Sequence, residues 1–340
     1  MQRIAQVPQS ERDALFREAT RLLGWRNVRI VEKDFWVCWT LDRLFRISGV
    51  REHLVFKGGT SLSKVHQLIE RFSEDIDLCV DPARLGLAEA LERDQSRTHL
   101  SKQWKILAEA CYDYAASAIL PALQAAAKEV PALQAEDAHG WRIEPDRQGF
   151  PLLLFRYPTS EKSRDFGYIA PEVKIEIGSL TDQLPVGEHT VAPYVAQALP
   201  ELKILQSSAL TVLEVDRTFW EKATILHNEY FRPATSVSTE RISRHYYDLA
   251  MLANSPAGQR ALTKTEWRER VIDHKQRFFK TGWSSFETAR RGTFHLLPSE
   301  ARRKVLHSDY ERMDEMFFLK RPSFDAILEI LGKLEQTLNA

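Results

Sequence analysis

The chain has 340 residues, enough to bury a sizeable hydrophobic core as one large domain or two. Its 47 Lys and Arg residues balance its 47 Asp and Glu residues, which excludes an overall charge that would draw it to nucleic acid or to a membrane surface. Any basic surface must therefore be local.

The cysteines and the N-terminal residues indicate a reducing compartment. Cys38, Cys79 and Cys111 form no CxxC pair, and we expect them to be buried free thiols. Residues 1–16 lack the apolar segment of a signal peptide. No run approaches the ~20 uninterrupted apolar residues that span a bilayer. We therefore expect a cytoplasmic protein with no membrane partner.

Two helices are expected first, at residues 10–23 and 31–46. Apolar residues recur at helical spacing in both, and the second is dense in aromatic residues that we expect in the core. Glu32, Lys33 and Asp34 stand at its start, where acids favour the positive end of the helix dipole. We expect these three side chains to be solvated rather than functional.

The central stretch is residues 54–80, LVFKGGTSLSKVHQLIERFSEDIDLCV. Its apolar start followed by Gly58 and Gly59 predicts a strand and then a tight turn. Apolar residues then recur at helical spacing as far as Ile69. One of three hydroxyl residues is expected to cap this helix: Thr60, Ser61 or Ser63.

Acidic and apolar residues alternate at the end of this stretch. Asp75 and Asp77 should share one face of a strand, while Ile76 and Leu78 point into the core. A glycine turn lets backbone N–H groups approach an anion, and paired carboxylates bind a hard divalent cation that bridges to phosphates. The pattern therefore indicates a metal-bound nucleoside triphosphate, the alternative being a strand with surface acids.

Further along the chain, a long helix is predicted at 100–130 and strands at 151–157 and 169–177. The polar segment 134–150 should form turns around a strand-like Trp141-Arg142-Ile143, and 158–167 should form a charged hairpin loop. The Pro- and Gly-rich stretch 178–208 is the best candidate for a domain boundary. After it, helices are expected at 216–229, 239–252, 264–280 and 323–338.

The order of these elements predicts the fold class. Strands alternating with helices come first and helices alone follow, which indicates an α/β (α+β) protein. We expect a small mixed sheet with flanking helices in residues 1–205 and a helical bundle that completes the site in residues 206–340.

Three further charged positions carry a chemical interpretation. Glu176 lies in the middle of a predicted strand among apolar neighbours, where an unpaired acid is costly. It is either a third metal ligand or the ion-pair partner of Lys174 on the same face. Lys222 beside an apolar stripe either extends its ammonium to solvent or neutralises a triphosphate. Arg244 and Asp248 are four residues apart and share a helix face. They form an ion pair, or Asp248 has a functional role: it orders Lys222 or Arg244, or it accepts a proton.

Six segments together resemble a known family: EKDFWV, FKGGTSLSK, RFSEDIDL, VKIEI, EKATILH and RHYYDLAML. They resemble the AbiEii nucleotidyltransferases, toxins of type IV toxin–antitoxin and abortive-infection modules, which share the core of the DNA polymerase β superfamily. The gap from Gly59 to Asp75 is slightly longer than in the superfamily signature, and we recognise no motif of the family in residues 256–340.

The resemblance implies a set of site residues. Asp75 and Asp77 would bind Mg²⁺ or Mn²⁺, Lys222 would lie at the nucleotide, and Asp248 would be an essential acid. Glu176 is expected as a third ligand. The residues expected at the phosphates or elsewhere at the nucleotide are Gly58, Gly59, Thr60, Ser61, Lys64, Ser73 and Arg244.

The resemblance also implies partners: an NTP, an RNA acceptor with the 3′ end of tRNA as the expected one, and a separate antitoxin protein. Segment 264–304 holds eleven Lys or Arg against five acids, with aromatic residues between them. Such a segment suits an RNA surface, or it is an amphipathic helix with a solvated basic face. Transfer to a protein or small molecule, and nucleotide binding without catalysis, remain the alternative functions.

Overall fold

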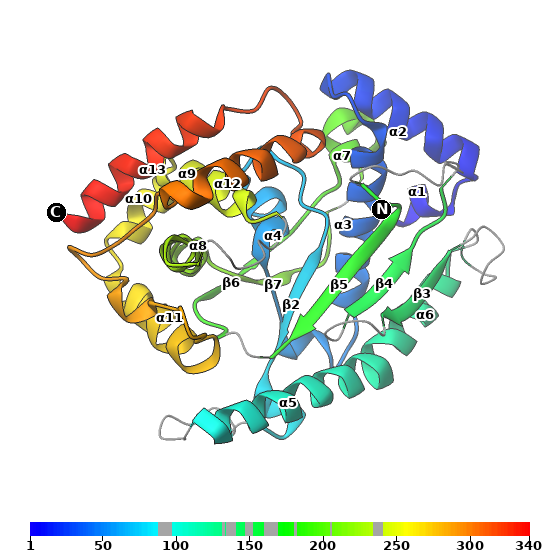
Figure 1. The fold of residues 1–340 in the computed structure, drawn as a ribbon. Helices are drawn as coiled ribbons and strands as arrows, with labels where there is room; N and C mark the ends of the chain where they lie inside the picture. Colours follow the sequence, from blue (N-terminus) through cyan, green and yellow to red (C-terminus); the bar gives the residue numbers. More distant parts are fainter. Residues whose placement is uncertain are drawn as a thin grey trace. The chain divides into compact units, whose positions relative to one another are not determined.

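The computed structural model describes residues 1–87, 97–130, 133, 141–146, 152–159, 169–179, 182–204, 206–233 and 241–340. Most of the predicted turns in 134–150 and of the loop in 158–167 lie outside these residues. The chain divides into two compact units (Figure 1). The sheet unit comprises Met1–Val65 and Phe72–Val212, and the helical unit comprises His66–Arg71 and Leu213–Ala340. The predicted domain limits stay a prediction.

A mixed sheet of seven strands, in the order β3-β4-β5-β2-β1-β7-β6, forms the centre of the sheet unit. Its strands are β1 Leu54–Lys57, β2 Ile76–Val80, β3 Arg142–Asp146, β4 Leu152–Arg156, β5 Glu172–Gly178, β6 Val186–His189 and β7 Leu210–Leu213. β1 is antiparallel to β2 and parallel to β7, and β2 is parallel to β5. This arrangement confirms the predicted mixed sheet.

The α-helices in the described part of the sheet unit are α1 Gln2–Gln6, α2 Gln9–Leu23, α3 Val28–Leu44, α4 Gly58–Lys64, α5 Arg97–Tyr114, α6 Leu120–Lys128 and α7 Tyr194–Ala198. α3 begins where Asn27 accepts a hydrogen bond from the N–H of Arg29 at 3.0 Å, a side-chain N-cap. Trp36 and Trp39 of α3 pack on Phe155 of β4, with ring centroids 5.6 and 5.8 Å apart. α3 is thereby a core helix.

The burial of α3 corrects one expectation. Glu32, Lys33 and Asp34 are not solvated, because 8% or less of each residue is exposed. α3 contacts α2 and α7 as well as β5, so even its polar residues are enclosed. Charged groups in such surroundings need partners, since the loss of hydration is costly.

The predicted long helix is confirmed as α5, a π-turn at Ala115–Ile119 and α6. Within it, Lys102–Lys128 is long and apolar enough to cross a membrane by length and composition, with 33% of the tested window buried in the protein. Such a helix is weak evidence for a membrane span, because a core helix of a soluble protein passes the same test. One stripe of its side chains, including Leu107, Cys111 and Leu123, is buried in the sheet unit.

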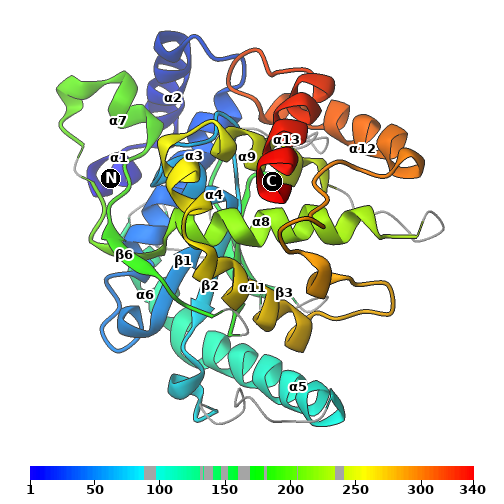
Figure 2. The same cartoon turned by 90° about the vertical axis from the view of Figure 1, so that its left-hand side faces the viewer.

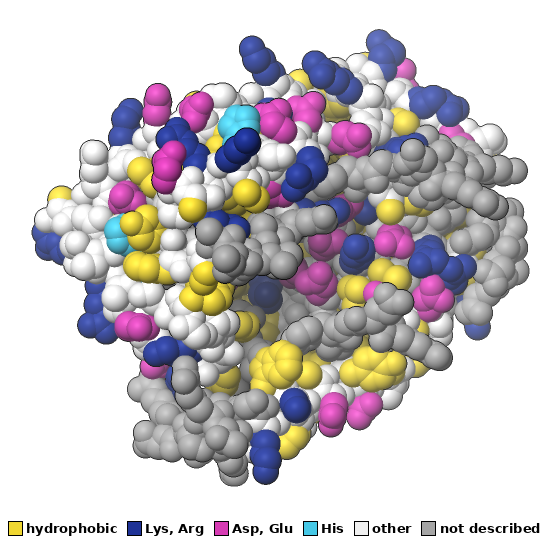
Figure 3. Space-filling view, viewed as in Figure 1, with side chains coloured by type: hydrophobic (Ala, Val, Ile, Leu, Met, Phe, Trp, Pro, Cys, Tyr) yellow, Lys and Arg dark blue, Asp and Glu magenta, His cyan; other side chains and the backbone are white. Residues whose placement is uncertain are grey.

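The helical unit contains α8 Val215–Tyr230, α9 Ser243–Ala253, α10 Pro256–Leu262, α11 Thr265–Phe278, α12 Glu300–Arg312 and α13 Phe324–Asn339. The four predicted C-terminal helices are confirmed as α8, α9, α11 and α13, whereas α10 and α12 were not predicted. α9 contacts α8, α10, α12 and α13, and Figure 2 shows it above α8 and beside α13. Acidic and basic side chains are interspersed over the described part of the face in Figure 3, in keeping with the zero net charge.

Candidate active site

β1 runs directly into α4 at Gly58, and this junction forms the turn of the candidate site. Lys57 occupies the N-cap position, and its side chain does not cap the helix, so the predicted hydroxyl cap is wrong. The hydroxyls have other partners: Thr60 donates to the carbonyl of Asp75 at 2.5 Å, and Ser61 donates to the carbonyl of Gly58 at 2.8 Å. They tie the turn to the acidic segment and to itself.

α4 is also shorter than the periodicity predicts. It ends at Lys64, and Gln67 adopts a φ of 52°, which an α-helix does not accommodate. The apolar residues Leu68 and Ile69 therefore do not extend the helix. Residues 66–71 instead belong to the helical unit.

Gly58 brings the turn into contact with the carboxylate of Asp77. Its φ is +82°, a region that L side chains rarely adopt. A Cβ added here would lie 2.8 Å from Cγ of Asp77 and closer still to its Oδ2. Only glycine lets the backbone and this carboxylate approach each other so closely.

The register of β2 against β5 pairs Asp77 with Glu176. Side chains at directly paired positions of neighbouring strands share a face, so both carboxylates lie on one side of the sheet. Asp75 immediately precedes β2, and Ile76 and Leu78 are buried as predicted. The strands thus gather three acids near the glycine turn.

Glu176 is exposed, whereas Asp75 and Asp77 are half-buried. The expectation that apolar surroundings make a bare acid costly at Glu176 is therefore wrong, because its strand face is open to solvent. Val173, Ile175 and Ile177 fill the opposite, buried face of β5. Lys174 shares the face of Glu176, so the alternative of a pair between them stays open.

The donor set suits a hard divalent cation, since Mg²⁺ prefers carboxylate oxygens and keeps several waters. The ligand atoms of Asp75, Asp77 and Glu176 do not all lie within 4.8 Å of one another. Like-charged carboxylates repel each other, and rotation about their side-chain bonds is sufficient to change the separation. These residues therefore fit a cation by chemistry and by strand face.

In the helical unit, Asp248 of α9 is the centre of a buried charge cluster. Arg71 donates from Nε to Oδ1 at 2.7 Å and from Nη2 to Oδ2 at 2.8 Å, and Lys222 of α8 donates to Oδ2 at 2.7 Å. At most 6% of each of these residues is exposed. The structure thus brings Lys222 and Asp248 together, and Lys222 does not extend to solvent.

The positively charged side chains of Arg71 and Lys222 keep Asp248 ionised. Burial by itself would raise the pKa of Asp248, but Arg71 and Lys222 outweigh it and hold the pKa below its usual range. Burial lowers the pKa of Lys222, and the neighbouring Arg71 lowers it further, against the opposing effect of Asp248. Asp248 is therefore a carboxylate rather than a proton acceptor at neutral pH.

Arg71, rather than Arg244, is the arginine that binds Asp248. Within the described part of the chain, Arg244 forms no ion pair with Asp248, although the two are four residues apart on α9. Sequence reasoning missed Arg71, since it lies 177 residues from its partner. The only signal was an arginine in the motif RFSEDIDL.

A sequence model of the family described as nucleotidyl transferase AbiEii toxins of type IV toxin–antitoxin systems matches residues 39–330. The chain belongs to the AbiEii nucleotidyltransferase toxin family. Membership implies an NTP substrate, a divalent metal and a cognate antitoxin.

Two solved structures are similar to this AbiEii-family chain. One is MenT4, a nucleotidyltransferase toxin of Mycobacterium tuberculosis, with 14% identity, a TM-score of 0.43 and coverage of 98% of this chain and 100% of that chain. The other is JHP933 of Helicobacter pylori, with 13% identity, a TM-score of 0.31 and coverage of 88% and 92%. No curated protein matches the chain.

Lys64 and Ser73 are buried in this AbiEii-family chain, with 7% and 8% of each residue exposed. The ammonium of Lys64 lies 2.7 Å from Oδ1 of Asp34 and 3.4 Å from the ring centroid of Tyr194. This pairing gives Lys64 a structural partner, so we do not carry it into the proposed nucleotide site.

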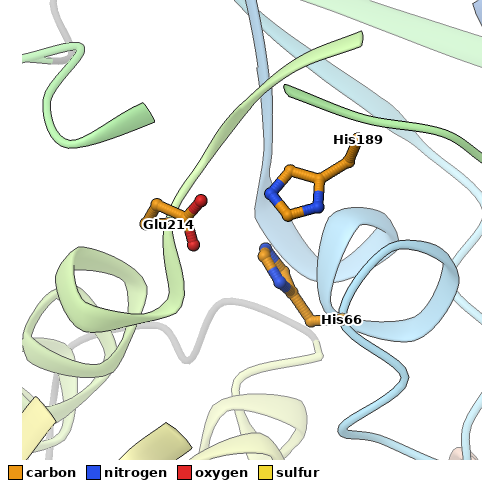
Figure 4. A group of neighbouring side chains, drawn as sticks. All are labelled: His66, His189 and Glu214. Atoms are coloured by element: carbon orange, nitrogen blue, oxygen red, sulfur yellow. The ribbon is translucent and has the colours of Figure 1, made fainter. Parts of the chain in front are cut away.

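His66 and Glu214 also lie close together in the helical unit, with ligand atoms within 4.8 Å of each other (Figure 4). Nε2 of His66 lies 3.4 Å from the carbonyl oxygen of Leu213. Zinc sites use three or four protein ligands, so this pair by itself makes no metal site. His189, drawn in the same figure, belongs to β6 of the sheet unit.

Segment 264–304 contributes to both core and surface. Phe286 and Phe294 are buried, and Arg302 is buried against Glu229 at 2.5 Å. By contrast, 47% of Phe279 is exposed, and the guanidinium of Arg277 lies 5.1 Å from the ring centroid of Phe278. The segment therefore divides between core and surface, and its exposed part includes the end of α11.

Proposed function

We propose that Asp75, Asp77 and Glu176 bind a divalent cation, Mg²⁺ or Mn²⁺, and that the protein transfers an NMP from an NTP to an acceptor hydroxyl with pyrophosphate leaving. The observation that carries the proposal is the register of β2 against β5, which pairs Asp77 with Glu176 beside Gly58. A strand face of three acids gains little stability without a cation, since like charges repel.

The proposed site residues of the sheet unit have different roles. A cation, when bound, activates the attacking hydroxyl and neutralises phosphate charge. The carboxylates would hold and orient the cation. The glycine turn lets backbone N–H groups approach the phosphates without a side chain between them. Thr60 and Ser61 hold the turn through their hydroxyl hydrogen bonds.

The helical unit contributes Lys222 and Asp248 to the proposal. Asp248 keeps two cationic side chains in fixed positions, because its oxygens accept the three hydrogen bonds described above. A lysine held in this way is suited to neutralise triphosphate charge. Substitution Lys222→Met should raise KM for the NTP and lower kcat, which steady-state kinetics would measure.

The acceptor we propose is RNA, with the 3′ end of tRNA as the specific site, and the physiological outcome is arrested translation in the cytoplasm. The family supports a toxin that works with an antitoxin. The exposed aromatic and basic side chains at the end of α11 support a nucleic-acid acceptor, because such groups stack bases and bind phosphates.

The test is incubation with each labelled NTP, Mg²⁺ and total RNA. We expect labelled RNA with the wild type and a loss of at least ~100-fold in Asp77→Asn and Glu176→Gln, the order of loss when an essential charge-stabilising group is removed. Glu188→Gln, which changes an exposed acid on β6, is the matched control and should retain activity.

The outcomes separate the functions. Equal labelling by the wild type and Asp77→Asn would overturn the proposal. Labelled protein or small molecule without labelled RNA would keep the transfer and replace the acceptor. Calorimetry that detects NTP binding in the absence of any turnover would make the protein a non-catalytic binder.

A further inference from the structure

Three consecutive charged residues at the start of α3 are buried, and the proposed chemistry uses none of them. We propose that two of them, Lys33 and Asp34, are positioning residues that hold the acidic strands and the glycine turn in the arrangement needed for catalysis. This inference rests on the proposed function, because it concerns the same site.

Lys33 joins the chain segments that lead into the two acidic strands. Its ammonium donates to Oε2 of Glu74 at 2.6 Å and to the carbonyl of Ala170 at 3.0 Å. Glu74 directly precedes Asp75, and Ala170 lies two residues before the start of β5. One ammonium therefore fixes the start of β2 relative to the start of β5, and this relation sets Asp77 opposite Glu176.

Asp34 holds the other half of the site. Its Oδ1 lies 2.7 Å from the ammonium of Lys64, the last residue of α4, and its Oδ2 accepts the N–H of Tyr194 at 2.6 Å. The ring of Tyr194 lies under the same ammonium, with the centroid 3.4 Å away. Because α4 has only seven residues, fixing its end also fixes Gly58 at its beginning.

Stability alone does not account for these pairs. The four side chains are 5% exposed or less. A buried ion pair is weak evidence for stability, since apolar residues of similar volume often do as well or better. What the pairs supply is geometry, because an ammonium and a carboxylate at hydrogen-bond distance define both separation and direction.

Both pairs start from neighbouring residues of one rigid helix. α3 is anchored in the core by Trp36 and Trp39, so it serves as a fixed reference for two segments that are separate in the sequence. Metal sites depend on such supporting contacts, whose loss typically costs 10–100-fold in metal affinity.

The experiment measures Mn²⁺ binding to the full-length protein by electron paramagnetic resonance, without NTP. The test variant is the double substitution Lys33→Met and Glu74→Met, which removes both charges and leaves neither unpaired. We expect it to unfold within a few degrees of the wild type and to bind Mn²⁺ at least ~10-fold more weakly. Asp34→Leu with Lys64→Met should chiefly raise KM for the NTP.

Two further variants keep the result interpretable. Lys33→Arg retains the charge but not the shape of the ammonium, and it should also weaken Mn²⁺ binding if the double variant does not fold. Arg302→Met is the matched control, because the Arg302 guanidinium is buried and paired with Glu229 of α8 within the helical unit. It should lower stability and leave Mn²⁺ affinity unchanged.

The outcomes distinguish this inference from the proposed function. Wild-type protein that binds no Mn²⁺ would remove the proposed metal site and, with it, the positioning role. If the wild type binds Mn²⁺ and a folded double variant, or Lys33→Arg, binds it with the same affinity, the positioning role alone would be overturned. A loss of Mn²⁺ affinity equal to that of the Arg302→Met control would likewise assign the pairs to stability.

Discussion

Gly58 combines two constraints at one position: its φ is +82°, and an added Cβ would meet the carboxylate of Asp77. The left-handed conformation costs an L residue roughly 1–2 kcal/mol by itself. The collision adds to this cost, because Asp77 is held in a strand between β1 and β5 and has little room to withdraw.

Substitution of Gly58 by alanine should therefore lower both stability and metal affinity. We expect a loss of about 2–4 kcal/mol in the free energy of unfolding, the sum of the left-handed strain and a displaced side chain. Chemical denaturation would measure it. Gly86→Ala is the control, since Gly86 has a φ of +70° and open space around its Cβ position. A Gly58→Ala variant no less stable than Gly86→Ala would contradict the close approach to Asp77.

Asp248 predicts a pH dependence of stability. Its pKa is lower in the folded chain than the value of ~3.9 in an unfolded one. Its contribution is therefore fully present above about pH 4 and is lost as the pH falls toward the folded pKa. Asp248→Asn should cost about 3–5 kcal/mol at pH 7, because Arg71 and Lys222 lose their buried counter-charge.

Denaturation of the wild type and Asp248→Asn at pH 7, 4 and 3 would check this prediction. The difference in free energy of unfolding between the two proteins should decrease below pH 4, because protonation of Asp248 in the wild type removes the charge that the variant lacks. Asp325→Asn is the control, because its carboxylate is exposed and pairs only at the surface with Arg303. A difference that stays constant with pH would show that Asp248 is not a buried anion.

At the scale of elements, α9 is capped by another helix rather than by its own side chains. The residue at its N-cap position, Ile242, makes no side-chain cap. Asp309 of α12 instead accepts hydrogen bonds from the N–H groups of Arg241 at 2.9 Å and Ser243 at 2.8 Å. The position of Asp248 on α9 thus depends on α12.

Substitution Asp309→Ala should fray the start of α9. We expect a loss of about 1–2 kcal/mol, the usual cost of removing a carboxylate cap. Amide hydrogen exchange should be faster in the first turn of α9 than in the rest of that helix. Asp325→Ala, at an exposed position, is the comparison: it should change the free energy of unfolding by no more than about 0.5 kcal/mol and leave exchange in α9 unchanged. Unchanged exchange in Asp309→Ala would exclude the cap.

Periodicity predicted the long elements better than the short ones. α8 and α13 have many turns, so their apolar stripes are visible in the sequence. β6 and β7 were missed, because each has only four residues, which carry too little alternation to be recognised. β6 also lies among the prolines and glycines of 178–208. α4 was predicted too long, since Leu68 and Ile69 kept the helical spacing after the chain had left the helix.

At the scale of the whole molecule, the short segment His66–Arg71 departs from sequence order. It lies between α4 and β2 in the chain but groups with the helical unit. There the N–H of Glu70 donates to the hydroxyl of Tyr247 at 3.1 Å, and Arg71 binds Asp248. The helical unit is therefore incomplete without residues from the N-terminal half.

A fragment of residues 213–340 should consequently fold poorly when it is produced alone. Loss of Arg71 leaves Asp248 with Lys222 only, and breaking a buried ion pair typically costs about 3–5 kcal/mol. The comparison is the same fragment with residues 66–71 joined to its N-terminus by a long flexible linker, and thermal melting followed by circular dichroism would measure both. Equal melting of the two would show that the segment is dispensable.

The sequence by itself determined the chemistry of the candidate residues. Gly58 and Gly59 mark a turn, and the alternation around Asp75 and Asp77 marks a strand with acids on one face, because both patterns follow from local backbone geometry. The spacing of apolar residues likewise determined the mixed fold class and four of the C-terminal helices, α8, α9, α11 and α13.

The tertiary structure alone decided which charged groups pair. Arg71 reaches Asp248, Lys33 reaches Glu74, and Asp77 lies opposite Glu176, in each case across a long stretch of chain. Sequence spacing reports neighbours along one helix or strand, whereas these partners come from different elements. Burial then made the pairs necessary, because a charge removed from water is costly until an opposite charge or a hydrogen bond replaces the water.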